Sequence, residues 1–270
     1  MSEMRLVVLG AGGRMGRMLV KAVLSDAQTR LHAAVERAGS AFVGQDPMLL
    51  AGLPPGDILI VDDLDAALDG ADGVLDFTTP EATLALARKT GERGIAHIVG
   101  TTGFSADQFA ELRDLTRKTR VVQSGNMSLG VNMLAALVRR AARALGPEWD
   151  IEVLEMHHRM KVDAPSGTAL LLGEAAASGR AIDLAERSVR SRDGHTGARQ
   201  AGDIGFATLR GGSVVGDHSV IFATDGERIS LAHHAEDRGL FARGAIRAAL
   251  WVRDQPPGYY AMSDVLGLSD

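Results

Sequence analysis

The sequence predicts an α/β protein in which a Rossmann-type parallel-sheet domain is interrupted by an inserted α+β domain that carries an open, largely antiparallel sheet. Three observations lead to this prediction. Short apolar segments alternate with helical patterns in the first half, a glycine-rich turn follows the first apolar segment, and three β-type segments follow one another in the second half. Strands that alternate with helices form parallel sheets, whereas consecutive strands joined by tight turns form antiparallel ones.

The elements of the first half follow a β-α-β rhythm. Strands are predicted over residues 5–9, 31–35, 58–61, 73–77, 96–99 and 120–123, and helices over about 15–25, 80–92 and 105–118. The second helix begins with Pro80, a residue that the first helical turn accepts. Continuous apolar strands of this kind indicate a parallel sheet covered on both faces.

The pattern changes after residue 128. A long helix is predicted over residues 129–145, a strand over 150–157, a helix over 166–177, and three strands over 204–210, 213–224 and 227–234. Gly211-Gly212 and Asp225-Gly226 predict hairpin turns between these last strands. A closing helix over residues 239–253 is expected to return to the first domain. We therefore expect a dinucleotide-binding domain of residues 1–128 plus 239–270, and a substrate-binding and oligomerisation domain of residues 129–238.

The composition excludes several classes of function. The formal net charge is −5 and no basic stripe is present, so no nucleic-acid partner is expected. The chain contains no cysteine, which excludes disulfides, thiolate metal sites and cysteine nucleophiles. It has no signal-peptide pattern and no apolar stretch of roughly 18 residues, so we expect a cytoplasmic protein without a membrane span.

A glycine-rich loop follows the first strand and opens the first helix. It reads Gly10-Ala11-Gly12-Gly13-Arg14-Met15-Gly16. Bare backbone at a helix N-terminus suits a pyrophosphate, although such loops also occur only to pack a helix on a sheet, and the spacing departs from the strict dinucleotide fingerprint. The sequence context favours a nucleotide.

Glu36 and Arg37 end the second strand, about 20 residues after the loop. An acid there accepts hydrogen bonds from the ribose of NAD, whereas a guanidinium holds the 2′-phosphate of NADP. The pair leaves NADH and NADPH both open as cofactors.

Two further turns follow parallel strands and are expected to lie near the nicotinamide end of the cofactor. They are Gly100-Thr101-Thr102-Gly103 and Ser124-Gly125-Asn126-Met127.

The segment from Glu155 to Ala169 is the most informative one. It places His157, His158 and Lys161 before a helix start at Ser166, whose following N–H groups, at Gly167 and Thr168, favour an anion. Such a segment suits a small dicarboxylate and acid–base chemistry near neutral pH. No metal is expected, since adjacent histidines on a strand point to opposite faces. His32, His97 and His218 are interpreted as structural.

The chain resembles the 4-hydroxy-tetrahydrodipicolinate reductase (dihydrodipicolinate reductase) family of diaminopimelate and lysine biosynthesis. The resemblance rests on residues 10–16, 76–78, 100–104, 155–169, 191–197 and 205–210, which span nearly the whole chain in order. The His-His-x-x-Lys-x-Asp-x-Pro-Ser-Gly-Thr run is highly specific to that family.

The resemblance implies an NAD(P)H-dependent oxidoreductase that reduces a cyclic imine dicarboxylate to tetrahydrodipicolinate, and a homotetramer. It implies His157 as acid/base, Lys161 as proton donor, and His158, Gly167 and Thr168 as holders of the substrate carboxylates. The cofactor would lie on residues 10–15, with Glu36 and Arg37 at the adenosine ribose and Gly100–Thr102 and Ser124–Met127 at the nicotinamide.

Two alternatives stay open at this point. One is another Rossmann-type reductase with a different substrate. The short-chain type is disfavoured, because Tyr259 and Tyr260 lack the lysine four residues on that its Tyr-x-x-x-Lys pair requires. The other is a cofactor-binding sensor without turnover.

Overall fold

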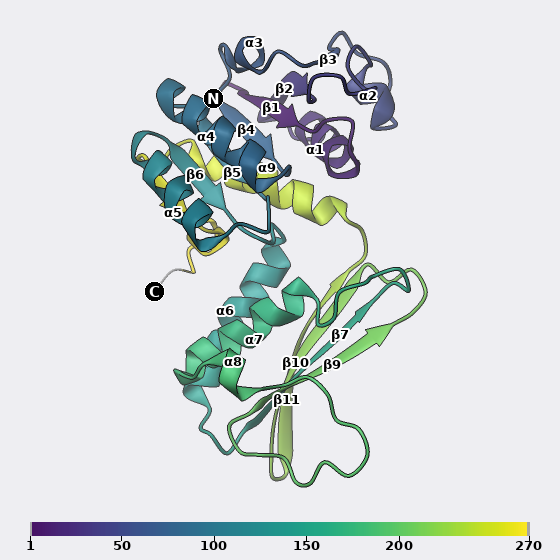
Figure 1. Cartoon of the computed structure of the whole chain (residues 1–270), viewed down its shortest axis with the longest axis vertical. Coiled ribbons are helices and arrows are strands. Elements are labelled where there is room, and N and C mark those ends of the chain that lie inside the picture. Colours follow the sequence, from purple (N-terminus) through teal and green to yellow (C-terminus); the bar gives the residue numbers. More distant parts are fainter. Residues whose placement is uncertain (1, 269–270) are drawn as a thin grey trace. The chain divides into compact units, whose positions relative to one another are not determined.

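The computed structural model describes residues 2–268, and the chain divides into two compact units (Figure 1). The first unit runs to Ser128 and resumes at Gly239, and the second comprises Leu129–Arg238. The second unit is therefore inserted into the first. No helix among the described residues is long and apolar enough to cross a membrane.

A seven-stranded sheet with the order β12-β6-β5-β4-β1-β2-β3 forms the centre of the first unit. Its strands are β1 (Met4–Leu9), β2 (Thr29–Val35), β3 (Ile60–Val61), β4 (Gly73–Asp76), β5 (Ala96–Val99), β6 (Arg120–Gln123) and β12 (Gly258–Tyr260). Every pairing within it is parallel. The order reverses between β1 and β4, so the carboxyl ends of these two strands flank the point where such sheets bind ligands.

Helices cover this sheet. They are α1 (Arg14–Ser25), α2 (Pro47–Leu50), α3 (Leu64–Leu68), α4 (Pro80–Arg93), α5 (Ala106–Leu115), α9 (Gly239–Val252) and α10 (Met262–Val265), with a 3₁₀ turn at Thr116–Lys118. α1 packs on α9, and α4 packs on α5. Consecutive strand residues such as Leu6, Val7 and Val8 are all fully buried, as expected for a sheet covered on both faces.

A mixed five-stranded sheet, with the order β11-β10-β7-β9-β8, forms the second unit together with its helices. The elements are α6 (Leu129–Ala144), β7 (Asp150–His157), α7 (Gly167–Arg180), α8 (Leu184–Arg187), β8 (Ser188–Val189), β9 (Ile204–Arg210), β10 (Gly216–Thr224) and β11 (Glu227–Ala235). Alternate residues of β7 are buried, and Ile151 and Val153 share one apolar core with residues of α6 and α7. The fold class predicted from the sequence is confirmed, except that the second sheet is mixed and not largely antiparallel, because β9 pairs in parallel with both β7 and β8.

One of the two predicted hairpin turns is wrong. Asp225-Gly226 does join paired neighbours, since Thr224 lies opposite Glu227 and Gly226 has a left-handed φ of 85°. Gly211-Gly212 does not, because β9 and β10 both pair with β7, which lies between them. The turn spans the end of β7, and the β7–β9 pairing is parallel.

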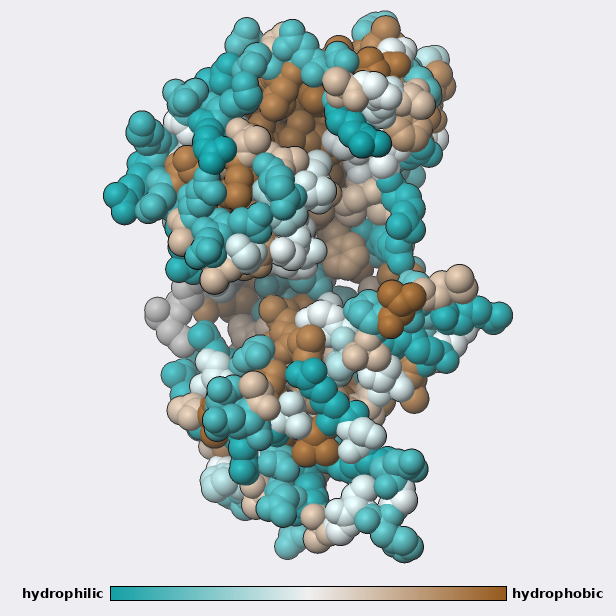
Figure 2. Space-filling model, viewed as in Figure 1, coloured by the Kyte–Doolittle hydropathy of each residue, from teal (hydrophilic) through white to brown (hydrophobic). Residues whose placement is uncertain are grey.

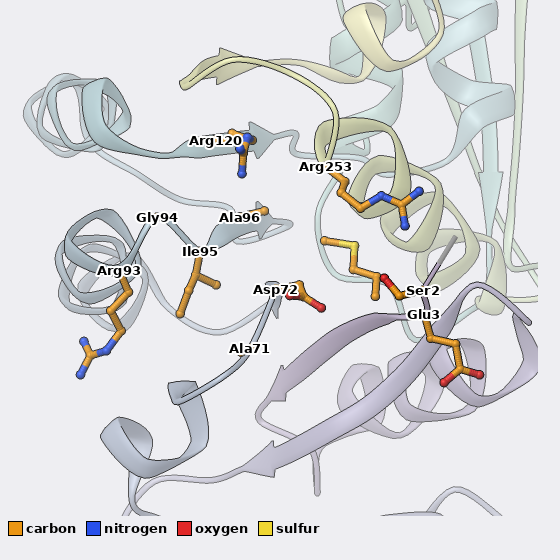
Figure 3. A pocket seen from close by; sticks show the side chains of 11 residues that line it. Ser2, Glu3, Ala71, Asp72, Arg93, Gly94, Ile95, Ala96, Arg120 and Arg253 are labelled. Carbon is orange, nitrogen blue, oxygen red and sulfur yellow. The ribbon is translucent and has the colours of Figure 1, made fainter.

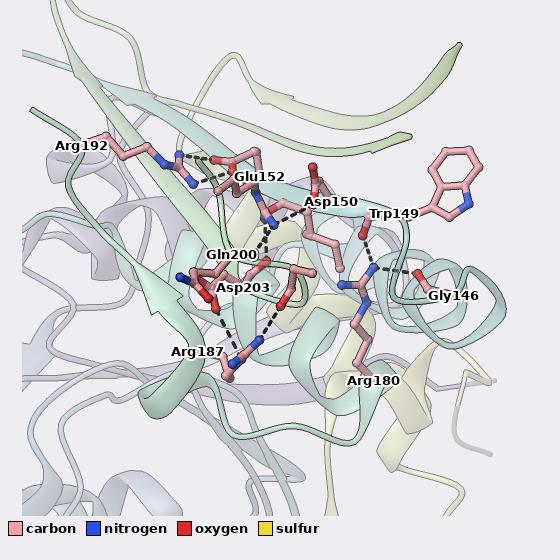
Figure 4. Close-up of polar contacts among 12 residues, drawn as sticks. Gly146, Trp149, Asp150, Glu152, Arg180, Arg187, Arg192, Gln200 and Asp203 are labelled. Carbon is pink, nitrogen blue, oxygen red and sulfur yellow. Dashed lines mark hydrogen bonds and ion pairs between the residues drawn. The ribbon is translucent and has the colours of Figure 1, made fainter. Parts of the chain in front are cut away.

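Ion pairs hold the long connection between β8 and β9 against the start of β7 (Figure 4). Arg192 pairs with Glu152 at 2.8 Å, and Arg199 pairs with both Asp150 at 2.8 Å and Glu152 at 3.1 Å. Burial would raise the pKa of Glu152, but the two guanidinium groups lower it below its ordinary value. The connection is thus fixed near the beginning of β7, away from His157 at its end.

A pocket of about 240 Å³ lies at the amino ends of the strands in the first unit's sheet (Figure 3), whereas the glycine loop follows the carboxyl end of β1. Its lining includes Met4, Ala96 and Arg120, which are the first residues of their strands. Hydrophilic side chains cover much of the surface of each unit in the view of Figure 2. Since parallel sheets bind ligands at the carboxyl ends of their strands, this pocket is not the candidate site.

Candidate active site

The glycine loop turns sharply between β1 and α1. Gly10 has a left-handed φ of 63°, which only glycine adopts at little cost. A Cβ on Gly16 would lie 2.0 Å from the carbonyl oxygen of Gly10, so a side chain there would separate α1 from the loop. Gly13 is the N-cap of α1 and offers no side chain to its first turn. The first N–H groups of α1, at Arg14 and Met15, therefore retain the donor character that attracts anions to helix N-termini.

The acid predicted at the end of β2 lies against this loop. Glu36 Oε1 accepts a hydrogen bond from the backbone N–H of Gly12 at 3.0 Å, whereas Arg37 is exposed. A Cβ on Gly12 would lie 2.3 Å from the ring of Phe42, and the Arg17 guanidinium lies 5.3 Å from the centre of that ring. The loop, the acid and Phe42 thus form one packed group, and Ala11 is buried within it.

A buried polar cluster surrounds Asp76, the last residue of β4. Asp76 Oδ2 lies 3.1 Å from His97 Nε2, and both side chains are fully buried. Thr78 donates to Asp76 from its N–H at 3.0 Å and from its hydroxyl at 2.6 Å. Burial would raise the pKa of Asp76, but His97 and the threonine hydroxyls lower it. This arrangement fixes Thr101, whose hydroxyl accepts from the Thr78 N–H at 3.1 Å.

The neighbouring turns have different exposures. Thr101 is buried, whereas Thr102 is exposed and Gly100 is half-buried. A Cβ on Gly100 would lie 2.2 Å from the ring of Phe77. The loop after β6 is stabilised by a hydrogen bond of its own, because the Ser124 hydroxyl donates to the Asn126 carbonyl oxygen at 2.7 Å.

Met127 is buried after this loop, and Gly125 is exposed. A Cβ on Gly244 of α9 would lie 1.7 Å from the Met127 carbonyl oxygen. The helix that returns to the first unit thereby packs directly on the end of this loop.

In the second unit, a carboxylate near the end of β7 accepts four hydrogen bonds. Glu155 accepts from His157 Nδ1 at 2.6 Å, from the Ser166 N–H at 3.0 Å, and from both terminal nitrogens of Arg210 at 2.8 and 3.0 Å. Glu155 is almost fully buried, and His157 is 8% exposed. Burial would raise the pKa of Glu155, but Arg210, His157 and the Ser166 N–H together lower it.

The loop between β7 and α7 carries the predicted lysine. Lys161 Nζ donates to Asp163 at 2.8 Å, and Arg210 donates to the Asp163 carbonyl oxygen at 2.6 Å. His158 Nε2 lies 3.2 Å from Arg238, and it accepts in this contact because a guanidinium only donates. Lys161 and His158, which both belong to this loop, thus each contact a charged side chain.

The N-terminus of α7 follows this loop. Ser166 is its N-cap, and its hydroxyl accepts from the Ala169 N–H at 3.1 Å. His218 Nε2 lies 3.1 Å from the same hydroxyl, and the His218 ring lies 5.0 Å from that of His157. Gly167 is exposed, and a Cβ on it would meet nothing within 4 Å. The first turn of α7 is therefore open to an anion on its Gly167 side.

Family models describe nearly the whole chain. The N-terminal model of dihydrodipicolinate reductase matches residues 4–127, and the C-terminal model matches residues 130–266. The chain belongs to the dihydrodipicolinate reductase family. The boundary between the two models falls where the chain passes from the first unit to the second.

Similar proteins of known name also belong to the dihydrodipicolinate reductase family. The 4-hydroxy-tetrahydrodipicolinate reductase of Rhodopseudomonas palustris (strain BisB18) is 59% identical over 270 residues, covering 100% of both chains. That of Rhizobium meliloti (strain 1021) is 59% identical over 268 residues, covering 99% of this chain and 98% of its own.

The solved structure of dipicolinate-bound dihydrodipicolinate reductase from Paenisporosarcina sp. TG-14 has the same fold. Its TM-score is 0.78 at 21% identity, covering 96% of this chain and 97% of that one.

Sequence reasoning missed several polar residues of this dihydrodipicolinate reductase family member. The sequence pattern places Glu155 at the start of the segment before α7, Arg210 at the end of a predicted strand and Asp76 within a family motif, but it assigns no role to any of them. The interpretation of His97 and His218 as structural stays a prediction: both are buried, His97 against Asp76, and His218 beside His157. The available signals were a charged residue in an apolar strand at Asp76, and at Glu155 a charged residue on the face of β7 that carries Ile151 and Val153.

Proposed function

We propose that the protein catalyses the NAD(P)H-dependent reduction of the cyclic imine dicarboxylate formed from 4-hydroxy-tetrahydrodipicolinate, giving tetrahydrodipicolinate. The observation that carries the proposal is the cationic loop between β7 and α7, which presents Lys161, His158 and the open N-terminus of α7 next to the buried pair of His157 and Glu155. The relatives named above, which match over 98–100% of their length, support it.

The first unit fits a dinucleotide. Gly10 allows the turn, Gly12 and Gly16 let the loop pack against Phe42 and α1, and the first turn of α1 offers donors for a pyrophosphate. In this proposal residues 10–15 hold the pyrophosphate, Glu36 and Arg37 contact the adenosine ribose, and Gly100–Thr102 with Ser124–Met127 line the nicotinamide. When bound, the nicotinamide supplies the hydride. Titrating NADH and NADPH separately decides the preference that Glu36 and Arg37 leave open.

The second unit fits a small dicarboxylate. The ammonium of Lys161 and the N–H groups of Gly167 and Thr168 are suited to carboxylate oxygens, and His158 adds a ring nitrogen. Dipicolinate, which the Paenisporosarcina relative binds, is a dicarboxylate of this kind. Reduction adds one hydride and one proton across the conjugated ring. Lys161 stabilises the developing negative charge and donates the proton, and His157 acts as acid/base.

Removing Lys161 tests this assignment. Lys161→Ala is expected to lower kcat by about 100-fold or more, because general acid catalysis contributes that much. The dissociation constant of the reduced cofactor, measured by its fluorescence, is expected to stay within about 2-fold. Lys89→Ala is a matched control, since Lys89 forms a comparable exposed pair with Asp65 in the first unit. Turnover that survives in Lys161→Ala contradicts the role.

The overall reaction is tested by the absorbance of the reduced cofactor. Freshly prepared substrate, made from pyruvate and aspartate semialdehyde, should cause enzyme-dependent loss of the signal. Cofactor binding without any turnover would favour a sensor, and turnover only with other carbonyl or imine substrates would favour a different Rossmann-type reductase. We also propose a homotetramer in the cytoplasm, and light scattering after size-exclusion chromatography tests the assembly.

A further inference from the structure

Glu155 is placed to control which ring nitrogen of His157 carries a proton. It lies two residues before His157 on β7, so both side chains point to the same buried side of the sheet. Its Oε2 lies 2.6 Å from His157 Nδ1. Since an ionised carboxylate only accepts hydrogen bonds, Nδ1 must be the donor in this contact.

The other donors around Glu155 keep the carboxylate in place. The Ser166 N–H and Arg210 Nη2 bond to Oε1, and Arg210 Nη1 shares Oε2 with His157. Ser166 is the N-cap residue of α7, and Arg210 is the last residue of β9. The carboxylate is therefore held from three elements, and it cannot turn away from the imidazole without losing its hydrogen bonds from the Ser166 N–H and Arg210.

The other ring nitrogen of His157, Nε2, faces the start of β10, where Gly216 has no side chain to cover it. A Cβ on Gly216, the first residue of β10, would come within 3.0 Å of His157 Nε2. The charged and titratable groups that face this histidine are Glu155 and Arg210, with His218 of β10 at 5.0 Å between ring centres. Burial and the neighbouring His157 lower the pKa of His218 to about 4, so His218 is neutral near neutral pH.

We propose that Glu155 is a positioning residue that holds neutral His157 as the Nδ1-protonated tautomer, leaving Nε2 as the nitrogen that exchanges a proton during the reaction. Arg210 secures Glu155 in that role. The inference rests on the proposed function only for its catalytic consequence, because the tautomer itself is a property of the protein without substrate.

The substitution Glu155→Gln is predicted to reverse the tautomer. The backbone N–H of Ser166 is always a donor, so the amide oxygen of the glutamine must face it. The amide NH₂ then faces His157 Nδ1 and donates to it, which moves the ring proton to Nε2. Glu152→Gln is a matched control, because Glu152 is also a glutamate on β7 that pairs with two arginines, Arg192 and Arg199.

Nitrogen-15 NMR of ring-labelled histidine measures the tautomer directly, at a pH high enough for neutral imidazole. The unaltered protein should show His157 protonated at Nδ1, and Glu155→Gln should show it protonated at Nε2, with Glu152→Gln unchanged. Glu155→Gln should also lower kcat by about 10–100-fold, while KM for the dicarboxylate changes by less than about 3-fold.

An Nε2-protonated His157 in the unaltered protein overturns the proposal, whether or not Glu155→Gln folds. An unchanged tautomer in folded Glu155→Gln overturns it as well. Absence of any reductase activity in the unaltered protein, with the expected tautomer present, instead contradicts the proposed function and leaves the positioning role standing.

Discussion

His218 shows how one buried side chain links stability to pH. It is 4% exposed, and its Nε2 lies against the Ser166 hydroxyl that caps α7. Desolvation and the neighbouring His157 lower its pKa to about 4. In the unfolded chain the same imidazole takes up a proton near its ordinary value of about 6.5. The unfolded state therefore binds more protons than the folded state between those two values, and stability falls as the pH falls through that window.

Replacing His218 should remove this dependence. In the unaltered protein, lowering the pH from about 6.5 to about 4 is expected to cost up to about 3 kcal/mol of unfolding free energy through this group. His218→Gln should flatten that part of the curve, measured by urea unfolding at several pH values. His195→Gln, at an exposed histidine, should leave the slope unchanged. A residual slope is expected from His233, whose pKa burial also lowers.

At the scale of the elements, strand β7 illustrates which features the sequence predicts and which it does not. Its alternating burial, its end at His157 and the helix start at Ser166 were all readable from local pattern. Its position between β9 and β10 was not, because strand order depends on pairing between segments far apart in the chain. The same limit hid Arg210, which meets Glu155 only because β9 lies beside β7. The short strands β8 and β12 carry too few residues for a pattern.

The packing of α6 on α7 makes a prediction against the usual helix preference. Alanine in place of glycine inside a helix normally stabilises it by about 0.5–1 kcal/mol. A Cβ on Gly179 of α7 would lie 2.3 Å from the Arg139 carbonyl oxygen and 2.8 Å from the Ala142 Cβ, both on α6. Gly179→Ala should therefore destabilise the protein by about 1–3 kcal/mol.

Urea unfolding measures this change. Gly91→Ala provides the comparison, because Gly91 is also inside a helix, α4, and its Cβ would meet only the Leu115 carbonyl oxygen at 3.4 Å. That variant is expected to be neutral or slightly stabilised. Equal effects at the two glycines would contradict the close approach of α6 and α7.

Over the whole molecule, carboxylates with lowered pKa values set the response to acid. Asp76 in the first unit and Glu155 in the second are both buried and both lowered by their partners. A carboxyl whose folded pKa is depressed contributes its full stability above its ordinary value of about 4, and that contribution is lost as the pH falls further. Both units should thus lose stability below about pH 4, each carboxyl contributing about 1.4 kcal/mol per pH unit.

Asp76→Asn should reduce this acid slope in urea titrations between about pH 5 and about pH 3. The variant is expected to be less stable at neutral pH, because His97 loses its carboxylate. Glu227→Gln, at an exposed carboxyl, should keep the full slope. The same slope in Asp76→Asn and in the unaltered protein would show that Asp76 is not ionised in the fold.

The discontinuity of the first unit has a consequence for biosynthesis. Its sheet receives the edge strand β12 and the covering helix α9 from the end of the chain, after residues 129–238 have been made. On the ribosome, the inserted unit is therefore the first whose entire chain is present. The segment up to Ser128 has to wait with an incomplete layer of helices, and it is the part of the nascent protein with the greatest need for a chaperone.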